Sequence, residues 1–460
     1  MNRRTSRVPR CGAALLLVAL SAGVPSAHAV APPPIDDSLL PHPALPAPPQ
    51  RTVQRETCAV GSMDPGAGGQ LDGLDLPRVW QLTRGSGQRV AIIDTGVSRH
   101  PRLPETAAGG DYVSIGDGSQ DCDGHGTAVA GIIAAAPDPK DGFSGVAPDV
   151  RLISIRQAST KFDAAADPSG TGFGDVDTMA KAVRTAADLG ASVINISSVA
   201  CVPVESGLDD RALGAALAYA VDVKNAVVVA AAGNTGGPGQ CPAQRPEQAG
   251  EIATVAVSPA WYDDYVLTVG SVNAQGAPST FTLAGPWVDV AAPGEAVVSL
   301  SLSGDGMVNA LGGKGDSTPL SGTSYAAPVV SGLVALVRSR FSTLTPRQVM
   351  QRIEATAHHP PAGWDPFVGN GVVDMPAAVS TDALAGPAPG PPGTAVPITP
   401  APSAAAPPDR GAHVTAYTGA AVCLTALAVA LITGLVTARL RRVRPQPDSG
   451  AAGGDGVPGD

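Results

Sequence analysis

The amino-acid sequence predicts an α/β fold in which a parallel sheet is covered by helices on both faces, followed by a single C-terminal transmembrane helix. Between residues 51 and 382, short runs rich in β-branched residues alternate with helical patterns. Alternation of this kind is typical of crossover units, which build a parallel sheet. Near the C-terminus, an uncharged apolar stretch at 414–438 is long enough to cross a bilayer.

The expected elements of the central body follow one another in a regular order. We expect strands at residues 89–93, 150–155, 192–196, 226–231, 266–269 and 288–290. We expect helices at residues 127–135, 176–189, 208–221, 324–341 and 346–355. The chain has 460 residues, which is enough for one large domain or two ordinary ones.

The first 29 residues have the features of a secretory signal peptide. Four arginines precede a short apolar run at 13–24, and the small residues Ala27 and Ala29 follow as a cleavage signal. An uncleaved membrane anchor is the alternative interpretation. We then expect an N-terminal extension at 30–84, Pro-rich up to residue 50, before the main folded domain at 85–382.

The C-terminal region predicts a membrane anchor. A Pro-rich linker at 383–413 leads into the expected transmembrane helix at 414–438, and an Arg-rich tail follows at 439–460. Positive charge flanks membrane helices on the cytoplasmic side, so we expect this tail in the cytoplasm and the main folded domain outside it. A buried core helix is the alternative, but no further domain follows that could bury it.

Charge and cysteine content argue against a nucleic-acid-binding protein and favour an exported protein with disulfides. The formal net charge is -10, and no dense basic run lies in the middle of the chain, which argues against nucleic-acid binding. Outside the signal peptide and the expected membrane helix, four cysteines remain: Cys58, Cys122, Cys201 and Cys241. In an exported protein they predict two disulfides with three possible pairings, and no C-x-x-C spacing supports a zinc site instead.

Four polar residues occur where α/β folds place their active sites. Asp94 ends a buried strand, His125 lies between two glycines that open a helix, and Asn234 follows the strand at 226–231. Ser324 lies in a small-residue turn before an apolar helix, where free N–H groups and the helix dipole favour negative charge. Each motif alone is weak, since a capping histidine or a turn asparagine is common.

Together the four residues supply the parts that acyl transfer needs. Ser324 would be the nucleophile and His125 the general base that later protonates the leaving amine. Asp94 would orient the imidazole, and Asn234 with the Ser324 N–H would hold the developing oxyanion.

The motifs around these residues, D-T-G, G-H-G-T, A-A-G-N and G-T-S-x-A-x-P, resemble those of the subtilisin-like serine proteases, or subtilases, in the same chain order. The resemblance covers most of residues 85–380. It implies the subtilisin-like fold and endopeptidase activity on protein or peptide substrates, without a catalytic metal or cofactor. It also implies that 195–199, including Ser197 and Ser198, forms the cleft edge that binds substrate backbone.

The wider architecture is similar to that of the mycosins, the membrane-anchored subtilases of type VII secretion systems. Tyr325 within G-T-S-Y-A-A-P fits that group. The similarity implies a single-pass protein of the cell membrane that works with the type VII membrane complex. It further implies an extension that stays attached, with disulfides Cys58–Cys122 and Cys201–Cys241.

Two departures from secreted subtilisins affect these expectations. The segment before the catalytic core is short for a folded inhibitory prodomain, and Val199 stands where many subtilases carry Gly.

Residues 157–175 are expected to form a solvated surface loop, with substrate gating as the alternative.

Two other functions stay open at this point. In the first, the domain serves mainly as a structural component of the secretion complex. In the second, it is a general cell-surface subtilase unconnected to secretion.

Overall fold

The computed structural model describes residues 31–64, 69–166, 172–237, 240–244, 253–313 and 316–381. The expected signal peptide, the whole of the linker expected at 383–413 and everything beyond it lie outside these ranges. Within these ranges, no helix is both long and apolar enough to cross a membrane. The transmembrane helix expected at 414–438 therefore stays a prediction.

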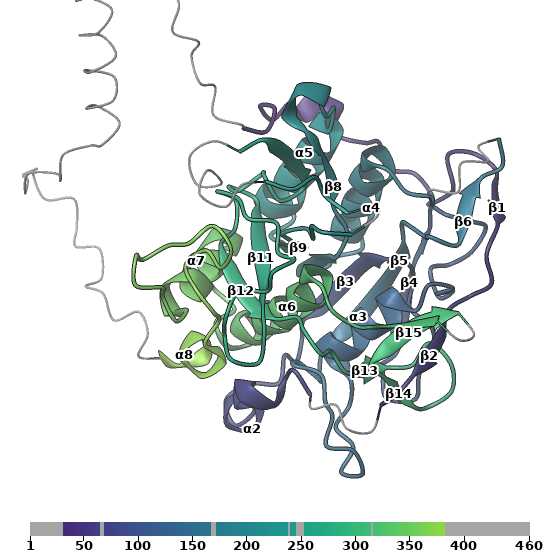
Figure 1. Cartoon of the computed structure of the whole chain (residues 1–460). Helices are drawn as coiled ribbons and strands as arrows, with labels where there is room; N and C mark the ends of the chain where they lie inside the picture. The colour runs from purple at the N-terminus through teal and green to yellow at the C-terminus, as the bar shows by residue number, and fades with distance from the viewer. Residues whose placement is uncertain are drawn as a thin grey trace, which may run out of the picture. The chain divides into compact units, whose positions relative to one another are not determined.

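The central feature of the body is a parallel sheet of seven strands in the order β12-β11-β9-β7-β3-β5-β4 (Figure 1). In chain order the strands are β3 (Arg89–Asp94), β4 (Thr106–Asp111), β5 (Arg151–Arg156), β7 (Val193–Ile196), β9 (Val227–Ala231), β11 (Val266–Val272) and β12 (Val290–Pro293). Every neighbouring pair runs parallel. The reversal of strand order around β3 is the feature that places sites in open α/β sheets.

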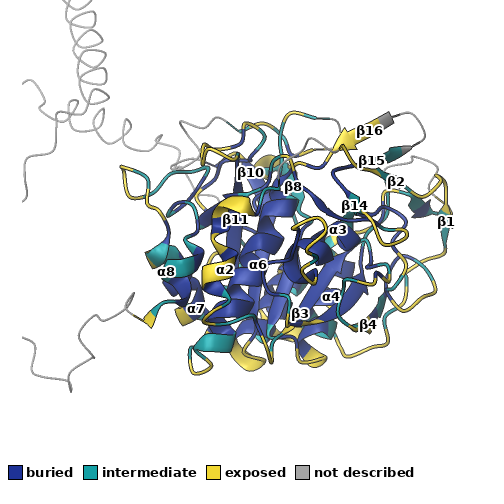
Figure 2. Ribbon diagram, turned by 90° about the horizontal axis from the view of Figure 1, so that it is seen from below, coloured by how far each residue is buried: buried dark blue, intermediate teal, exposed yellow. Residues whose placement is uncertain are grey.

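Helices cover both faces of this sheet, as the sequence predicts. The larger helices are α3 (His125–Ala134), α4 (Val176–Asp188), α5 (Arg211–Ala218), α6 (Thr323–Arg340) and α7 (Pro346–Thr356). In β3, Val90 and Ile92 pack into the core that contains α3 and α6, whereas Ala91 and Ile93 pack against α4 and α5. Because alternate residues face opposite layers, nearly every strand residue is buried (Figure 2).

The differences from the expected elements have local causes. Strand β4 is missing from the prediction because its sequence, TAAGGD, contains no β-branched run. The last strand begins at Val290 rather than at residue 288. The helix expected at 208–221 is shorter, and continues as one π-helical turn at Tyr219–Val223.

The remaining elements are short. The helical ones are η1 (Asp37–Leu39), η2 (Asp72–Leu74), α2 (Leu76–Val79), η3 (Val204–Ser206) and α8 (Met375–Val379). The strands form small antiparallel sheets: β1 (Thr52–Gln54) with β6 (Phe162–Ala164), β8 (Ala200–Pro203) with β10 (Val255–Ser258), β13 (Ser299–Leu300) with β14 (Met307–Val308), and β15 (Ala310–Gly313) with both β2 (Val60–Ser62) and β16 (Asp316–Pro319).

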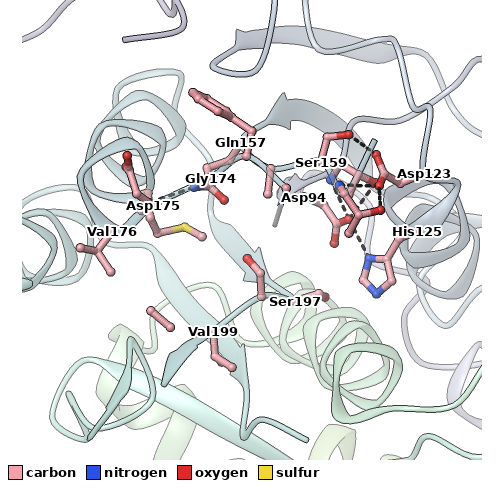
Figure 3. Close-up of a pocket in the computed structure, with 18 of the residues that line it drawn as sticks. Asp94, Asp123, His125, Gln157, Ser159, Gly174, Asp175, Val176, Ser197 and Val199 are labelled. Carbon is pink, nitrogen blue, oxygen red and sulfur yellow. Dashed lines mark hydrogen bonds and ion pairs between the residues drawn. The ribbon is translucent and has the colours of Figure 1, made fainter. Parts of the chain in front are cut away.

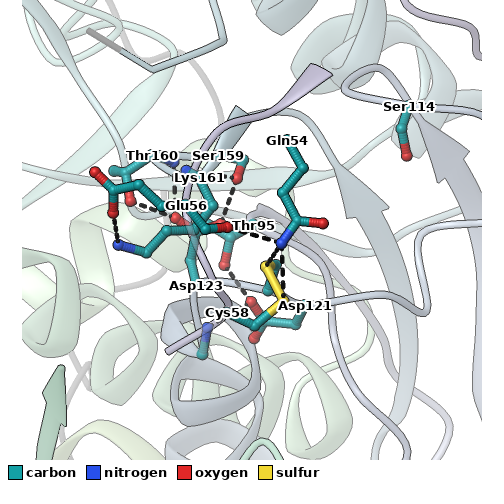
Figure 4. Close-up of a disulfide and its surroundings, with 12 residues drawn as sticks. Gln54, Glu56, Cys58, Thr95, Ser114, Asp121, Asp123, Ser159, Thr160 and Lys161 are labelled. Atoms are coloured by element: carbon teal, nitrogen blue, oxygen red, sulfur yellow. Dashed lines mark hydrogen bonds and ion pairs between the residues drawn. A yellow bond between two sulfur atoms is a disulfide. The ribbon is translucent and has the colours of Figure 1, made fainter. Parts of the chain in front are cut away.

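The segment expected to be an N-terminal extension contacts the body along much of its length. Its strands β1 and β2 pair with β6 and β15, which come from distant parts of the chain. The Cys58–Cys122 disulfide joins it to the loop before α3 (Figure 4). The second disulfide links Cys201 to Cys241, so both pairings are those that the mycosin resemblance implies.

A group of carboxylic acids lies beside the edge strand β12. Asp289 precedes this strand, Glu354 belongs to α7, and Asp263 precedes β11. Burial, with the charge of a neighbouring carboxyl group, raises the pKa of all three residues above their ordinary values. An acid whose pKa rises on folding stabilises the folded state below its ordinary pKa, and this contribution is lost as the pH rises.

We therefore predict that Asp289→Asn stabilises the protein at pH 8 but has little effect at pH 4, where the carboxyl is already protonated. The amide oxygen can still accept the hydrogen bond that the Thr268 N–H donates to Asp289. Removing the charge should raise the thermal midpoint by roughly 2–4 °C at pH 8, the shift that about 1 kcal/mol produces in a domain of moderate size. Thermal unfolding across this pH range measures the difference. An equal shift at both pH values would contradict this account.

Candidate active site

Three side chains from distant parts of the chain meet at the carboxyl end of the sheet. Asp94 is the last residue of β3, His125 is the first residue of α3, and Ser324 lies in the first turn of α6. The site therefore joins one strand end to two helix N-termini, as open α/β sheets favour. Gly126 allows this approach, since a Cβ there would lie 2.1 Å from the Gly96 carbonyl oxygen.

The three side chains form a continuous hydrogen-bonded chain. His125 Nδ1 lies 2.7 Å from Asp94 Oδ1, and His125 Nε2 lies 2.9 Å from Ser324 Oγ. The Asp94 side chain is 3% exposed, whereas the His125 side chain is 24% exposed, so the imidazole is the part that solvent and ligands reach. A histidine held in this way can take a proton from the serine hydroxyl while the carboxylate fixes its tautomer.

The charges around His125 favour its protonated form. Burial alone would lower the pKa of the imidazole, but the adjacent Asp94 carboxylate and its hydrogen bond outweigh burial. The carboxylates of Asp121 and Asp123 add to this effect, and the pKa of His125 lies above its ordinary value. The site can therefore stabilise an imidazolium that forms during the reaction.

The side-chain amide of Asn234 is held in one orientation. Its Oδ1 accepts hydrogen bonds from the Thr323 N–H at 2.9 Å and from the Thr323 hydroxyl at 3.1 Å. These two donors identify the oxygen, which leaves Nδ2 as the free donor. A Cβ on Gly322 would lie 3.2 Å from both Asn234 Nδ2 and Ser324 Oγ, so the two atoms flank one point beside the serine hydroxyl. This is the geometry expected of an oxyanion donor.

Tyr325 is a neighbour of the imidazole for which the sequence suggested no role in the site. Its ring centroid lies 4.9 Å from that of His125, with the rings tilted by 44°. Tyr325 is 6% exposed, and burial followed by the charges of Asp94 and Asp121 raises the pKa of its phenol. Its position directly after the nucleophile is the signal that would have found it.

A cleft of about 580 Å³ begins at Asp94 and His125 and extends toward α4 (Figure 3). Ser197 and Ser198, the residues expected at the cleft edge, line it together with Val199. The Ser197 hydroxyl accepts a hydrogen bond from Asn195 Nδ2, whereas Ser198 Oγ is buried with no partner among the residues that the structure describes. The cleft therefore has a wall of small polar groups beside the apolar side chain of Val199.

The loop expected at 157–175 also lines the cleft, at 157–160 and 172–175. It is therefore more than the solvated surface loop that its composition predicts. Asp123 holds its first part, because its carboxylate accepts hydrogen bonds from the hydroxyls of Ser159 and Thr160 at 2.5 and 2.6 Å. Composition alone carries no signal for such a contact.

The Cys201–Cys241 disulfide lies next to the Asn234 loop. The Cys241 N–H donates to the Asn234 carbonyl oxygen at 2.9 Å, and Cys201 belongs to β8, which directly follows the cleft edge. The disulfide thus connects the cleft edge to the segment that carries Asn234.

Comparisons with known proteins identify the family that the chain resembles. Residues 85–371 match the model of the subtilase family, described as Peptidase_S8. The chain is 66% identical to Mycosin-4 of Mycobacterium tuberculosis over 99% of its own length and 100% of that protein. It is 47% identical to Mycosin-1 of the same organism, over 82% of this chain and 88% of the relative.

Solved structures give the same result. The MycP3 protease from the type VII (ESX-3) secretion system is 46% identical, with a TM-score of 0.71, over 77% of this chain and 100% of that one. A chain in the structure of an intact ESX-5 inner membrane complex is 42% identical, with a TM-score of 0.71, over 89% and 100%.

The geometry of Asn234 generates a prediction about catalysis. Asn234→Ala should lower turnover by about 10²–10³-fold with a small change in KM, because an oxyanion donor acts on the transition state rather than on bound substrate. Hydrolysis of an unfolded protein substrate that carries a fluorescent label measures kcat and KM. Asn273, whose side chain accepts hydrogen bonds inside a turn, supplies the control Asn273→Ala. Equal losses in the two variants would rule out a specific role for Asn234.

Proposed function

Because this chain belongs to the subtilase family and, within it, to the mycosins, we propose that it is a membrane-anchored serine endopeptidase that acts outside the cytoplasm in type VII secretion. Family membership makes the chain a serine endopeptidase. The proposal adds which residues catalyse the reaction, where the domain lies and with what it works.

The hydrogen-bonded chain Asp94–His125–Ser324 is the observation that carries the catalytic assignment. Ser324 attacks the substrate carbonyl while His125 takes its proton and later transfers it to the leaving amine. Asp94 orients the imidazole, and Asn234 with the Ser324 N–H binds the oxyanion. Substrate backbone lies along the segment that contains Ser197 and Ser198, where an extended peptide can pair with the cleft edge.

The topology in this proposal rests on the sequence. A signal peptide at 1–29 directs export, the extension at 30–84 stays attached, and the catalytic domain occupies 85–382. The linker at 383–413 leads to a membrane helix at 414–438, and the tail at 439–460 lies in the cytoplasm. The two disulfides support an extracytoplasmic location, because such bonds persist in oxidising compartments.

The relatives support a place in a secretion complex. The ESX-5 inner membrane complex contains a chain of this fold, 42% identical over 89% of the present one. The same observation favours a second function, in which the domain stabilises the complex independently of proteolysis. It disfavours a general surface subtilase unconnected to secretion.

Labelling with a fluorophosphonate tests the catalytic proposal. The full chain in detergent should be labelled, Ser324→Ala should not, and Ser321→Ala should be labelled like the parent. Ser321 is a matched control because it lies three residues away and its hydroxyl donates to the Leu320 carbonyl oxygen instead. Labelling of Ser324→Ala at the parental rate would refute the assignment.

A secretion assay distinguishes the proteolytic function from the structural one. If proteolysis is required, a strain that carries only Ser324→Ala should lose processing or export of type VII substrates. If the domain acts as a structural component, this strain should secrete normally, whereas deletion of the whole chain should abolish secretion.

A further inference from the structure

Asp121 lies four residues before His125 and is almost fully buried, at 6% exposure. Its carboxylate accepts four hydrogen bonds. One oxygen accepts from the Gly124 N–H at 2.7 Å and the Thr95 hydroxyl at 2.9 Å. The other accepts from the Thr127 N–H at 2.8 Å and the Thr127 hydroxyl at 2.6 Å. Asp121 is thus the centre of a small polar network beside the active site (Figure 4).

Through two of these bonds Asp121 holds the start of α3. The residue at the N-cap position is Gly124, which has no side chain to cap the helix. The Asp121 carboxylate caps the helix instead, since it accepts hydrogen bonds from backbone N–H groups at the helix start and complements the positive end of the helix dipole. Because His125 is the first residue of this helix, the same contacts determine where the imidazole lies.

Through Thr95 the network reaches the other partner of the imidazole. The Thr95 hydroxyl lies 2.9 Å from Asp121 Oδ1 and 3.2 Å from Asp94 Oδ1, and accepts the Gly126 N–H at 2.9 Å. One hydroxyl therefore lies between the two carboxylates and binds the residue after His125. Asp121 itself is not among the residues that line the described cleft.

We infer that Asp121 is a positioning residue for the reaction: it holds His125 against Asp94 and Ser324 by fastening the start of α3 and the Thr95 hydroxyl together. This inference rests on the proposed function of Ser324 and His125.

The charge of Asp121 has a second effect on the same histidine. The charged groups that act on His125 are the carboxylates of Asp94, Asp121 and Asp123, and the buried Tyr325 ring packs beside it. Burial raises the pKa of Asp121 to about 6 although its hydrogen bonds oppose this, so at neutral pH the group is mostly ionised. Removing this negative charge should lower the pKa of His125.

The rate of fluorophosphonate labelling as a function of pH tests the inference, because the reaction requires Ser324 and neutral His125. In Asp121→Asn we expect the plateau rate to fall by about 10- to 100-fold, since small displacements of a catalytic group cost this much. We also expect the acid limb of the profile to move to lower pH. Both measurements use the full chain in detergent.

Asp210→Asn is the matched control. Asp210 is 1% exposed and directly precedes α5, and its carboxylate accepts hydrogen bonds from Trp261 and Tyr262 rather than from residues next to His125. Its replacement should lower thermal stability without moving the acid limb. If Asp121→Asn fails to fold, Thr95→Val, which removes the hydroxyl link but keeps the Asp121 carboxylate, should lower the plateau rate, and Thr95→Ser should restore it.

The outcomes separate the two claims. A labelled parent with an unchanged plateau and acid limb in Asp121→Asn would overturn the positioning role alone. The same result for Asp210→Asn and Asp121→Asn, with a lower rate and no pH shift in either, would reduce Asp121 to a structural residue. A parent that is not labelled at Ser324 would overturn the proposed function, and this inference with it.

Discussion

The structure depends on one constraint, which is that His125 must lie within hydrogen-bond distance of two side chains at once. Asp94 is 31 residues away in the chain and Ser324 is 199 residues away. Their convergence follows from the parallel sheet, whose carboxyl edge brings strand ends and helix N-termini together. Strand β3, whose alternate side chains are buried on both faces, holds Asp94 in place, and the apolar helix α6 holds Ser324.

Three consecutive residues before α3 connect this constraint to the rest of the molecule. Asp121 bonds the helix start and Thr95, Cys122 is joined to the extension, and Asp123 holds the cleft loop at Ser159 and Thr160. A single short turn therefore links His125, the N-terminal extension and the loop that lines the cleft.

The sequence predicted the elements whose residues carry a strong local pattern. The β-branched runs of β3, β7 and β9 and the apolar helix α6 occur close to where they are expected, and the motifs locate Asp94, His125, Asn234 and Ser324. Strand β4 was not predicted, because Ala and Gly dominate its sequence and its extended conformation depends on pairing with β5. For residues 157–160 the sequence favoured a solvated loop over a role at the cleft, since the contact that holds them there depends on Asp123, which is distant in sequence and carries no periodic signal.

The covalent connection between Cys58 and Cys122 changes what a break in the main chain would mean. Any backbone cut between these two residues, including one that the enzyme makes itself, leaves both pieces in one molecule until a reductant separates them. Strand β2 lies within this loop and pairs with β15, whose Leu311 lines the cleft. Nicking there would thus generate a two-chain protease with its cleft still assembled, rather than a mature enzyme and a released peptide.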